Sequence, residues 1–462
     1  MFESSTNISP HRRLANFANR LATTCLPNRN VSRCLYLLSA TVCISLVFPN
    51  FVIGQTTNVP SSDSGVTAPQ AKDQKQESPT QQQKNGKAQK PGQDSPQQQI
   101  ETELRRIGKK YKQPSLFAGY QTLGKPFVGA ALGRRKKGSQ TRVTIDDKVH
   151  LGSCSKAMTA TMIARLIERG PLEHGTLKWD TTIAEGLPEL SKVIAPVFRD
   201  VTLRQLLMHR GGCPANTHWP AAGYKKSIVE TRRSLVRIAL KKEQENKPGD
   251  FLYSNVGYLV AGAMAERATG KSWEDLMRKE IFEPLGITSG GFGPPDVDQD
   301  LQQPWGHMSV ATLQIPTHFD NPESLGPAGR VHISLEDWAK FCLSHVLTGN
   351  EVEGDKESQA AKAAAKLKLV SQSNLDLMHT PLEDVEGDGA DYALGWDVLQ
   401  REWGGTVFTH SGSNTLWTTI VWISPDNKSV YLTATNIANA QSGIGLDKIF
   451  ATLIRLEKEA RK

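Results

Sequence analysis

The chain has 462 residues, of which 38% are hydrophobic and 22% charged, a composition that permits a sizeable folded core. Its formal net charge of +8 suggests a nucleic-acid partner, but most of this charge lies near the N-terminus. Residues 1–54 hold five arginines against one glutamate, and residues 55–99 carry five lysines against four acidic residues. The small surplus left for residues 100–462 cannot form an electrostatic footprint for nucleic acid, so we exclude that partner.

The first 54 residues are predicted to be a signal peptide or an N-terminal membrane anchor. Arginines precede the apolar run "CLYLLSATVCISLVF", which is short for a bilayer span and has the length of a signal-peptide core. Residues 51–53 could extend this run, so cleavage and anchoring both stay open. The protein is therefore expected to be exported, and to be periplasmic, extracellular or membrane-anchored.

Residues 55–99 are rich in Gln, Ser, Pro and Lys and are predicted to be a disordered linker. Three of the six cysteines precede this linker. The other three are widely spaced, an odd number without metal-binding spacing, so neither a disulfide framework nor a metal site is predicted. They are Cys154, Cys213 and Cys342.

Residues 100–462 are predicted to form one α+β domain. The segment 100–111 has a helical pattern, and residues 115–135 read as two strands around Gly124. The middle of the chain is mostly helical, with N-terminal capping signals at Ser272 and Ser334. Residues 360–369 resemble an exposed helix in a surface insertion.

The C-terminal part returns to strands, with the runs "YALGWDVLQ", "TVFTHSGS", "WTTIVWIS" and "SVYLTATN", before a final helix over residues 446–460. Strands at both ends with helices between them predict one antiparallel sheet built from the two termini and flanked by helices, plus a mostly helical lobe.

The stretch "HLGSCSKAMTATMIARLIERG", residues 150–170, carries the first chemical motif. Ser153 and Lys156 form the S-x-x-K pattern at the start of an amphipathic helix. Residues three apart lie on the same helix face, so the lysine could assist loss of the serine proton. On its own this motif is weak, because Ser153 could simply cap a helix.

Two further motifs follow. Tyr253-Ser254-Asn255 is a Y-x-N sequence; a tyrosine near two cations can titrate below its usual pKa and act as a base, and the asparagine could hold a substrate amide or the lysine. His410-Ser411-Gly412 ends a predicted strand, where Gly412 could let a substrate backbone approach closely. Taken singly, a packed tyrosine and a structural histidine are the simpler interpretations.

In this order, S-x-x-K, Y-x-N and H-x-G resemble the motifs of the penicillin-recognising serine hydrolases, which include class C β-lactamases, D,D-peptidases and family VIII carboxylesterases. The flanking segments "VTLRQLLMHRGGCP", "KPGDFLYSNVGYLVAG" and "EPLGI" are also similar to that family. The resemblance covers residues 100–462 and implies a β-lactamase/transpeptidase-like fold. It also implies acyl transfer without a metal or organic cofactor.

The resemblance implies a role for each motif residue. Ser153 matches the acylated nucleophile, and Lys156 and Tyr253 match the pair that activates it and passes the proton to the leaving group. Asn255 and His410 match substrate-orienting side chains. Backbone N–H groups of Ser153 and Ser413, next to Gly412, match the oxyanion hole. Cys154 and Ser155 receive no role.

The substrate stays open among a peptide, an ester and a β-lactam. The third motif is H-S-G where K-T-G would supply a permanent cation for a substrate carboxylate, so the peptidase and esterase branches are favoured over efficient β-lactamase activity. The loop "HRGGCP" departs from the usual "TSG" type and is expected to border the site. A slowly deacylating or non-catalytic penicillin-binding sensor at the cell wall is the alternative.

Two further features bear on function. The basic segment 224–242 is interpreted mainly as a solvated helix face, with a rim for anionic cell-wall polymer such as peptidoglycan as the other option. The chain lacks a G-x-S-x-G elbow and an H-E-x-x-H motif, which argues against an α/β-hydrolase and against a zinc hydrolase.

Overall fold

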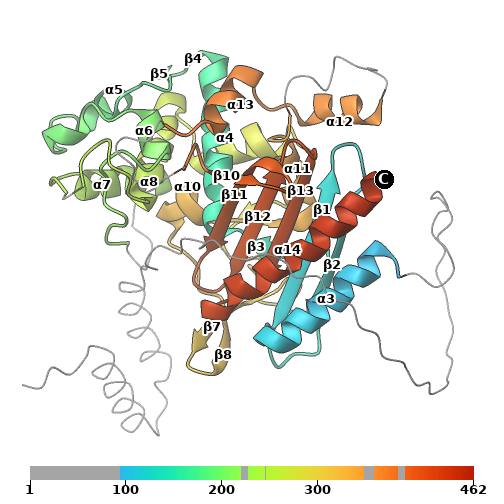
Figure 1. The fold of residues 1–462 in the computed structure, drawn as a ribbon. Coiled ribbons are helices and arrows are strands. Elements are labelled where there is room, and N and C mark those ends of the chain that lie inside the picture. Colours follow the sequence, from blue (N-terminus) through green and yellow to red (C-terminus); the bar gives the residue numbers. More distant parts are fainter. Residues whose placement is uncertain (1–93, 220–226, 245, 348–357, 383–390) are drawn as a thin grey trace, which may run out of the picture. The chain divides into compact units, whose positions relative to one another are not determined.

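The structure is a computed structural model, and it describes residues 94–219, 227–244, 246–347, 358–382 and 391–462 (Figure 1). The predicted signal peptide or anchor lies outside the described residues, as does the linker up to residue 93. Within the described parts of the chain, no helix is both long enough and apolar enough to span a bilayer.

A six-stranded antiparallel sheet combines both ends of the described chain (Figure 1). Its strand order is β10-β11-β12-β13-β1-β2. The strands are β1 (Ser115–Thr122), β2 (Val128–Gly133), β10 (Asp397–Arg401), β11 (Gly405–Ser413), β12 (Thr418–Ser424) and β13 (Ser429–Thr435). β1 lies between β2 and β13, with Phe117 opposite Ala131 on one side and Ala434 on the other. The predicted sheet from both termini is confirmed.

Helices cover both faces of this sheet. On one face lie α3 (Pro96–Tyr111) and α14 (Ala440–Arg461), which cross the sheet in Figure 1 and bury apolar residues at helical spacing against it. On the other face, α11 (Leu335–Leu343) packs on β1 and β13. The larger core on that face also includes α4 (Ser155–Arg169).

The remaining elements form the helical lobe and three small sheets. The helices are α5 (Ile183–Gly186), α6 (Leu203–Leu207), α7 (Ile228–Ala239), α8 (Asn255–Thr269), α9 (Trp273–Met277), α10 (Gly326–Gly329), α12 (Gln359–Leu367) and α13 (Gln372–His379). Short helical turns are η1 (Gly152–Cys154), η2 (Pro188–Leu190), η3 (Pro196–Phe198), η4 (Arg278–Phe282) and η5 (Glu323–Leu325). The small sheets are β14 (Ile437–Ala438) with β7 (Gly306–Val310) and β8 (Leu313–Thr317), β3 (Lys148–His150) with β9 (Val331–Ser334) and β6 (Gly291–Phe292), and β4 (Pro171–Leu172) with β5 (Gly175–Thr176).

Several predicted boundaries need correction. α3 begins at Pro96, because Ser95 caps it and Gln98 completes the capping box, so the linker ends before the predicted residue 99. α14 begins six residues before the predicted residue 446, with Asn439 as its cap. The helix near residue 360 is not simply exposed, since Ala361 and another alanine of α12 are buried.

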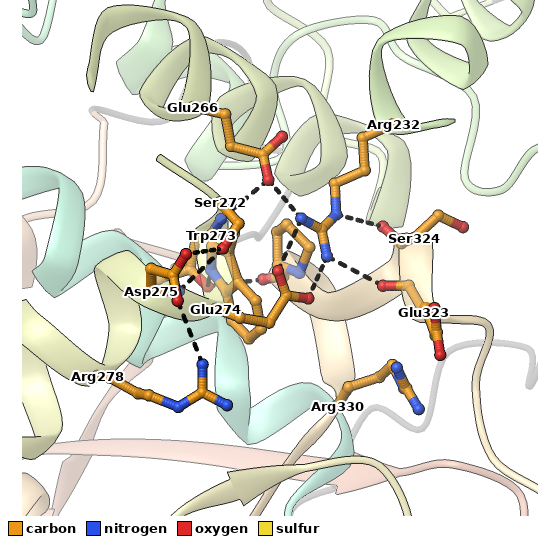
Figure 2. A network of polar contacts seen from close by, with 12 residues as sticks. Arg232, Glu266, Ser272, Trp273, Glu274, Asp275, Arg278, Glu323, Ser324 and Arg330 are labelled. Carbon is orange, nitrogen blue, oxygen red and sulfur yellow. Dashed lines mark hydrogen bonds and ion pairs between the residues drawn. The ribbon is translucent and has the colours of Figure 1, made fainter. Parts of the chain in front are cut away.

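The basic segment 224–242 is only partly a solvated face. Its described part forms α7, and within α7 the guanidinium of Arg232 is fully buried between Glu266 and Glu274 (Figure 2). Arg232 also donates to the backbone carbonyls of Glu323 and Ser324, immediately before α10 (Figure 2). This arginine therefore fixes the position of the segment that leads into α10.

Candidate active site

The predicted nucleophile lies in the tight turn η1, two residues before α4 begins at Ser155. Ser153 is thus not the cap of α4, a position taken by Cys154 without a side-chain hydrogen bond. Gly152 has a φ of +50°, and a Cβ atom at this position would lie 2.3 Å from the backbone nitrogen of Ser413. The turn therefore needs glycine both for its backbone conformation and for close approach of β11.

Lys156 extends from the first turn of α4 to Ser153. Its Nζ lies 3.0 Å from Ser153 Oγ, 2.8 Å from Asn255 Oδ1 and 2.8 Å from the carbonyl oxygen of Ala328 in α10. The residue is 0% exposed. The structure thus brings together two predicted motifs that are about 100 positions apart in the sequence.

Burial lowers the pKa of Lys156 from its ordinary value to about 7. A neutral amine has two N–H donors, which match the acceptors on Asn255 and Ala328, and its lone pair is then free to accept the Ser153 proton. The ammonium form would instead donate to all three oxygens. Lys156 can therefore serve as a general base close to neutral pH.

The rate of Ser153 acylation is expected to rise with pH. The active amine form of Lys156 replaces the ammonium form as pH increases through about 7, so the rate should rise through this value and level off above it. Single-turnover acylation by a p-nitrophenyl ester between pH 5 and 9, corrected for uncatalysed hydrolysis, measures this. A rate that is flat or falls over that range would contradict Lys156 as the base.

Tyr253 completes the proton-transfer group, but its predicted charge state is wrong. Its hydroxyl hydrogen-bonds the Ser153 side chain, and burial raises its pKa well above 10. The prediction of a lowered pKa required two nearby cations. Lys156 lies 4.8 Å from the ring centroid but is desolvated, and His410 is uncharged near neutral pH. Tyr253 thus remains a neutral phenol that can donate a proton.

Asn255 bonds the lysine, which is one of its two predicted roles. Its Oδ1 accepts from Lys156, and its Nδ2 donates to Asn216 Oδ1 at 2.9 Å. The backbone N–H of Asn255 donates to the carbonyl of Ala215, and Ser254 Oγ donates to that of Pro214. The last residue of the loop "HRGGCP" and the two residues after it therefore lie against this motif.

His410 is buried beneath the site and is only 3% exposed. Its Nδ1 lies 2.6 Å from the carbonyl oxygen of Ser411, so this nitrogen carries the proton, and Nε2 accepts from the Tyr392 hydroxyl at 3.0 Å. Burial and the nearby Lys156 lower its pKa to about 3. Both ring nitrogens are bonded within the protein, and direct binding of substrate by His410 stays a prediction.

Gly412 serves a different close approach from the predicted one. A Cβ atom at this position would lie 2.0 Å from the carbonyl oxygen of Leu151 and 3.0 Å from the backbone nitrogen of Cys154. The close approach that requires glycine here is that of the turn that holds Ser153, and approach of a substrate backbone to Gly412 stays a prediction. Gly412 therefore sets β11 against η1, and with it the position of Ser413.

The Gly412→Ala variant is expected to lose kcat by about 100-fold or more, the typical effect of removing one oxyanion-hole donor. The added methyl group must push β11 away from Leu151, which separates the N–H groups of Ser413 and Ser153. Steady-state ester hydrolysis measures the loss. Gly443→Ala is the matched control, because a Cβ atom there meets nothing within 4 Å. Equal rates for both variants would contradict this role of Gly412.

The chain is similar to known proteins in both sequence and structure. A family model described as "Beta-lactamase" matches residues 99–450. The chain belongs to this family. Membership in the Beta-lactamase family confirms the predicted β-lactamase/transpeptidase-like fold and the resemblance to penicillin-recognising serine hydrolases.

Individual members of the Beta-lactamase family are distant from this chain. "Penicillin-binding protein 4" of Amycolatopsis lactamdurans is 28% identical over 52% of this chain and 62% of its own length. The chain spans about half the length of the curated relatives that it matches. A D-amino acid amidase structure from Ochrobactrum anthropi SV3 is 19% identical, with a TM-score of 0.62 over 79% of this chain and 99% of the amidase. A class C beta-lactamase structure is 18% identical, with a TM-score of 0.61 over 78% and 96%.

Sequence reasoning missed three parts of this Beta-lactamase-family site. Ser155 has a role, because its Oγ donates to the Gly152 carbonyl and accepts from the Val331 N–H, tying the turn to β9. The His209 ring packs against the Tyr253 ring, with their planes tilted and their centroids 4.1 Å apart, and its Nδ1 accepts from the Ser254 N–H. No sequence pattern identifies the Ala328 carbonyl, because it is a backbone group. His209 belongs to the loop "HRGGCP", which was noted in the sequence, but no role was predicted for it.

Proposed function

We propose that this protein is a serine hydrolase that forms an acyl-Ser153 intermediate on an ester or peptide carbonyl. The observation that carries the proposal is the desolvated Lys156, with Nζ 3.0 Å from Ser153 Oγ and a pKa lowered to about 7. A surface lysine would be an ammonium ion at neutral pH and could not take the serine proton.

The proposed reaction has two halves. Ser153 Oγ bonds to the carbonyl carbon and gives its proton to Lys156, while the N–H groups of Ser153 and Ser413 stabilise the oxyanion. The Tyr253 hydroxyl then gives its proton to the leaving alcohol or amine and regains one from Lys156. In the second half, water attacks the acyl carbon, its proton passes to the same pair, and Ser153 Oγ leaves with a proton.

The uncharged His410 supports the esterase and peptidase branches. A lysine at this position would attract a substrate carboxylate, whereas His410 carries no charge near neutral pH and is bonded to Tyr392. We therefore favour esters or D-amino-acid peptides as substrates and expect efficient β-lactam hydrolysis to be absent. The fold alone does not select among these carbonyl compounds.

The test is an intact-mass time course of the protein with benzylpenicillin and, separately, with an activated ester. A Ser153-dependent ester adduct with continued turnover would support the proposal. A penicillin adduct that vanishes within seconds would move the assignment to a β-lactamase. An absence of any adduct in the folded protein would overturn the acyl-enzyme mechanism.

The alternative is a slowly deacylating penicillin sensor, for which the relative named penicillin-binding protein 4 is the supporting observation. A sensor should release about one equivalent of p-nitrophenol and then stop, whereas an enzyme continues to release it. The hydrogen-bonded arrangement of Ser153 and Lys156 with Tyr253 and Asn255, which come from two of the three motifs, favours the enzyme.

We also propose that the protein is exported and tethered at or near the cell wall, with peptidoglycan as a candidate partner. The support is the arginine-bearing apolar segment within residues 1–54 and the polar residues 55–93 that follow it. Cell fractionation with N-terminal sequencing of the mature chain would test both export and cleavage. Recovery of the uncleaved chain in the cytoplasm would overturn the proposal.

A further inference from the structure

Behind the nucleophile turn lies a buried carboxylate that the proposed reaction does not use. The Asp320 side chain is 5% exposed. Its Oδ1 lies 2.9 Å from His150 Nε2 and accepts from Asn414 Nδ2 at 2.8 Å, while its Oδ2 accepts from Arg330 Nε at 3.2 Å. One carboxylate thus joins three segments that are remote in sequence.

One of these contacts leads to the nucleophile turn. His150 ends β3, and its Nδ1 accepts from the backbone N–H of Gly152 at 3.1 Å, directly before Ser153. An Nδ1 that accepts cannot carry a proton, so the imidazole proton is on Nε2, the nitrogen that lies 2.9 Å from Asp320 Oδ1. The His150 side chain therefore links Asp320 to the backbone N–H of Gly152.

A second contact leads to the end of β11. Asn414 follows Ser413, and its Oδ1 accepts from the backbone N–H groups of Leu416 and Trp417. Its Nδ2 is the group that donates to Asp320. Because both ends of this buried side chain are engaged, the backbone next to the Ser413 N–H is tied to the carboxylate.

The charge of Asp320 is suited to such a link. Burial would raise the pKa of this carboxyl, but His150, Arg330 and Asn414 lower it to about 2. The group is therefore a carboxylate at any pH at which the protein would work. Hydrogen bonds to an ionised acceptor are shorter and stronger than those between neutral groups.

We propose that Asp320, with His150 and Asn414, forms a clasp that fixes the distance between the two oxyanion donors, the N–H groups of Ser153 and Ser413. These three are positioning residues, since they act through the neighbouring backbone and touch no reacting atom. The proposal rests on the proposed acyl-Ser153 function. The clasp complements the contact of Gly412 with Leu151, which sets how near the two segments come.

The kinetic test compares Asp320→Asn with wild type on a p-nitrophenyl ester and its thionoester. The asparagine side chain keeps the shape of the aspartate side chain but places an N–H donor where Asn414 and Arg330 also donate. We therefore expect kcat for the ester to fall about 10- to 100-fold, with little change in KM. The sulfur of the thionoester is a weaker hydrogen-bond acceptor than the carbonyl oxygen of the ester. The fall in kcat should therefore be smaller for the thionoester. A similar loss on both substrates, or no loss, would overturn the role in oxyanion stabilisation.

Two variants control this test. Glu457→Gln is the matched control, because Glu457 is a fully buried carboxylate that bonds Tyr431 and Ser429 on the α14 face of the sheet. It should leave the ester-to-thionoester ratio unchanged. His150→Asn retains an acceptor for the Gly152 N–H but cannot reach Asp320, so it should reproduce the Asp320→Asn loss. The double variant should be no worse than either single one.

Amide hydrogen exchange tests the clasp without turnover. Asp320→Asn should speed exchange in peptides covering residues 148–154 and 410–417 and leave the α14 peptides unchanged. If wild type fails to turn over the ester, the proposed function is wrong, and exchange alone then decides on the clasp. Unchanged exchange in both segments would overturn it.

Discussion

The Ser153→Ala protein is expected to form no covalent adduct with an activated ester and to lose all turnover above background. The Ser153 Oγ lies 3.0 Å from Lys156 Nζ and is also hydrogen-bonded to the Tyr253 side chain. Alanine removes the attacking atom but leaves the turn intact, because Gly152 and Ser155 hold its backbone. Intact-mass spectrometry and steady-state hydrolysis measure the loss.

Ser191→Ala is the matched control for this variant. Ser191 Oγ donates only to the nearby Pro188 carbonyl, in a short turn of the helical lobe. Its replacement should leave adduct formation and turnover unchanged. Near-normal turnover in the Ser153→Ala protein would overturn the acyl-serine mechanism, and would require a nucleophile elsewhere in the chain.

Removal of the Tyr253 hydroxyl is expected to lower kcat by about 100- to 10,000-fold, the range of general acid–base catalysis. Phenylalanine keeps the ring whose centroid lies 4.1 Å from that of His209, so the packing should persist. What is lost is the proton donor for the leaving group, because burial keeps the pKa of Tyr253 well above 10 and its hydroxyl protonated. The effect should grow as the leaving group becomes more basic.

Esters of p-nitrophenol and of ethanol separate these cases, because p-nitrophenolate leaves without protonation and ethoxide does not. Tyr258→Phe is the control, since Tyr258 belongs to the same ring cluster but donates to the Leu207 carbonyl. It should alter the melting temperature more than kcat. A Tyr253→Phe loss that is equal for both leaving groups would argue against the acid role.

The three motifs and the sheet were predictable because each leaves a local signal. Ser153, Lys156, Tyr253 and Asn255 occur as short motifs, and the C-terminal strands of the sheet occur as runs rich in Val, Ile, Tyr, Trp and Thr. Each motif is weak evidence by itself, and the order S-x-x-K, Y-x-N, H-x-G is what indicated the family. The structure then supplied the contact that sequence spacing only suggested, a lysine nitrogen 3.0 Å from the serine oxygen.

Charge states and supporting contacts were not predictable in the same way. The lowered pKa of His410 depends on its depth in the fold and on Lys156, which is 254 positions away in the chain. The link between Asp320 and His150 joins two residues without a shared motif. Gly412 was noted in the sequence, but its neighbour is the chain's own Leu151 carbonyl, which only the packing of β11 on η1 reveals.

The contact between η1 and β11 has a consequence for synthesis of the protein. Ser153 leaves the ribosome 260 residues before Ser413, and β1 must also wait for β13 to complete the sheet. A growing chain therefore contains the proposed nucleophile long before it contains the second proposed oxyanion donor. The proposed hydrolase should stay inert throughout translation, because an unfinished chain lacks the N–H of Ser413.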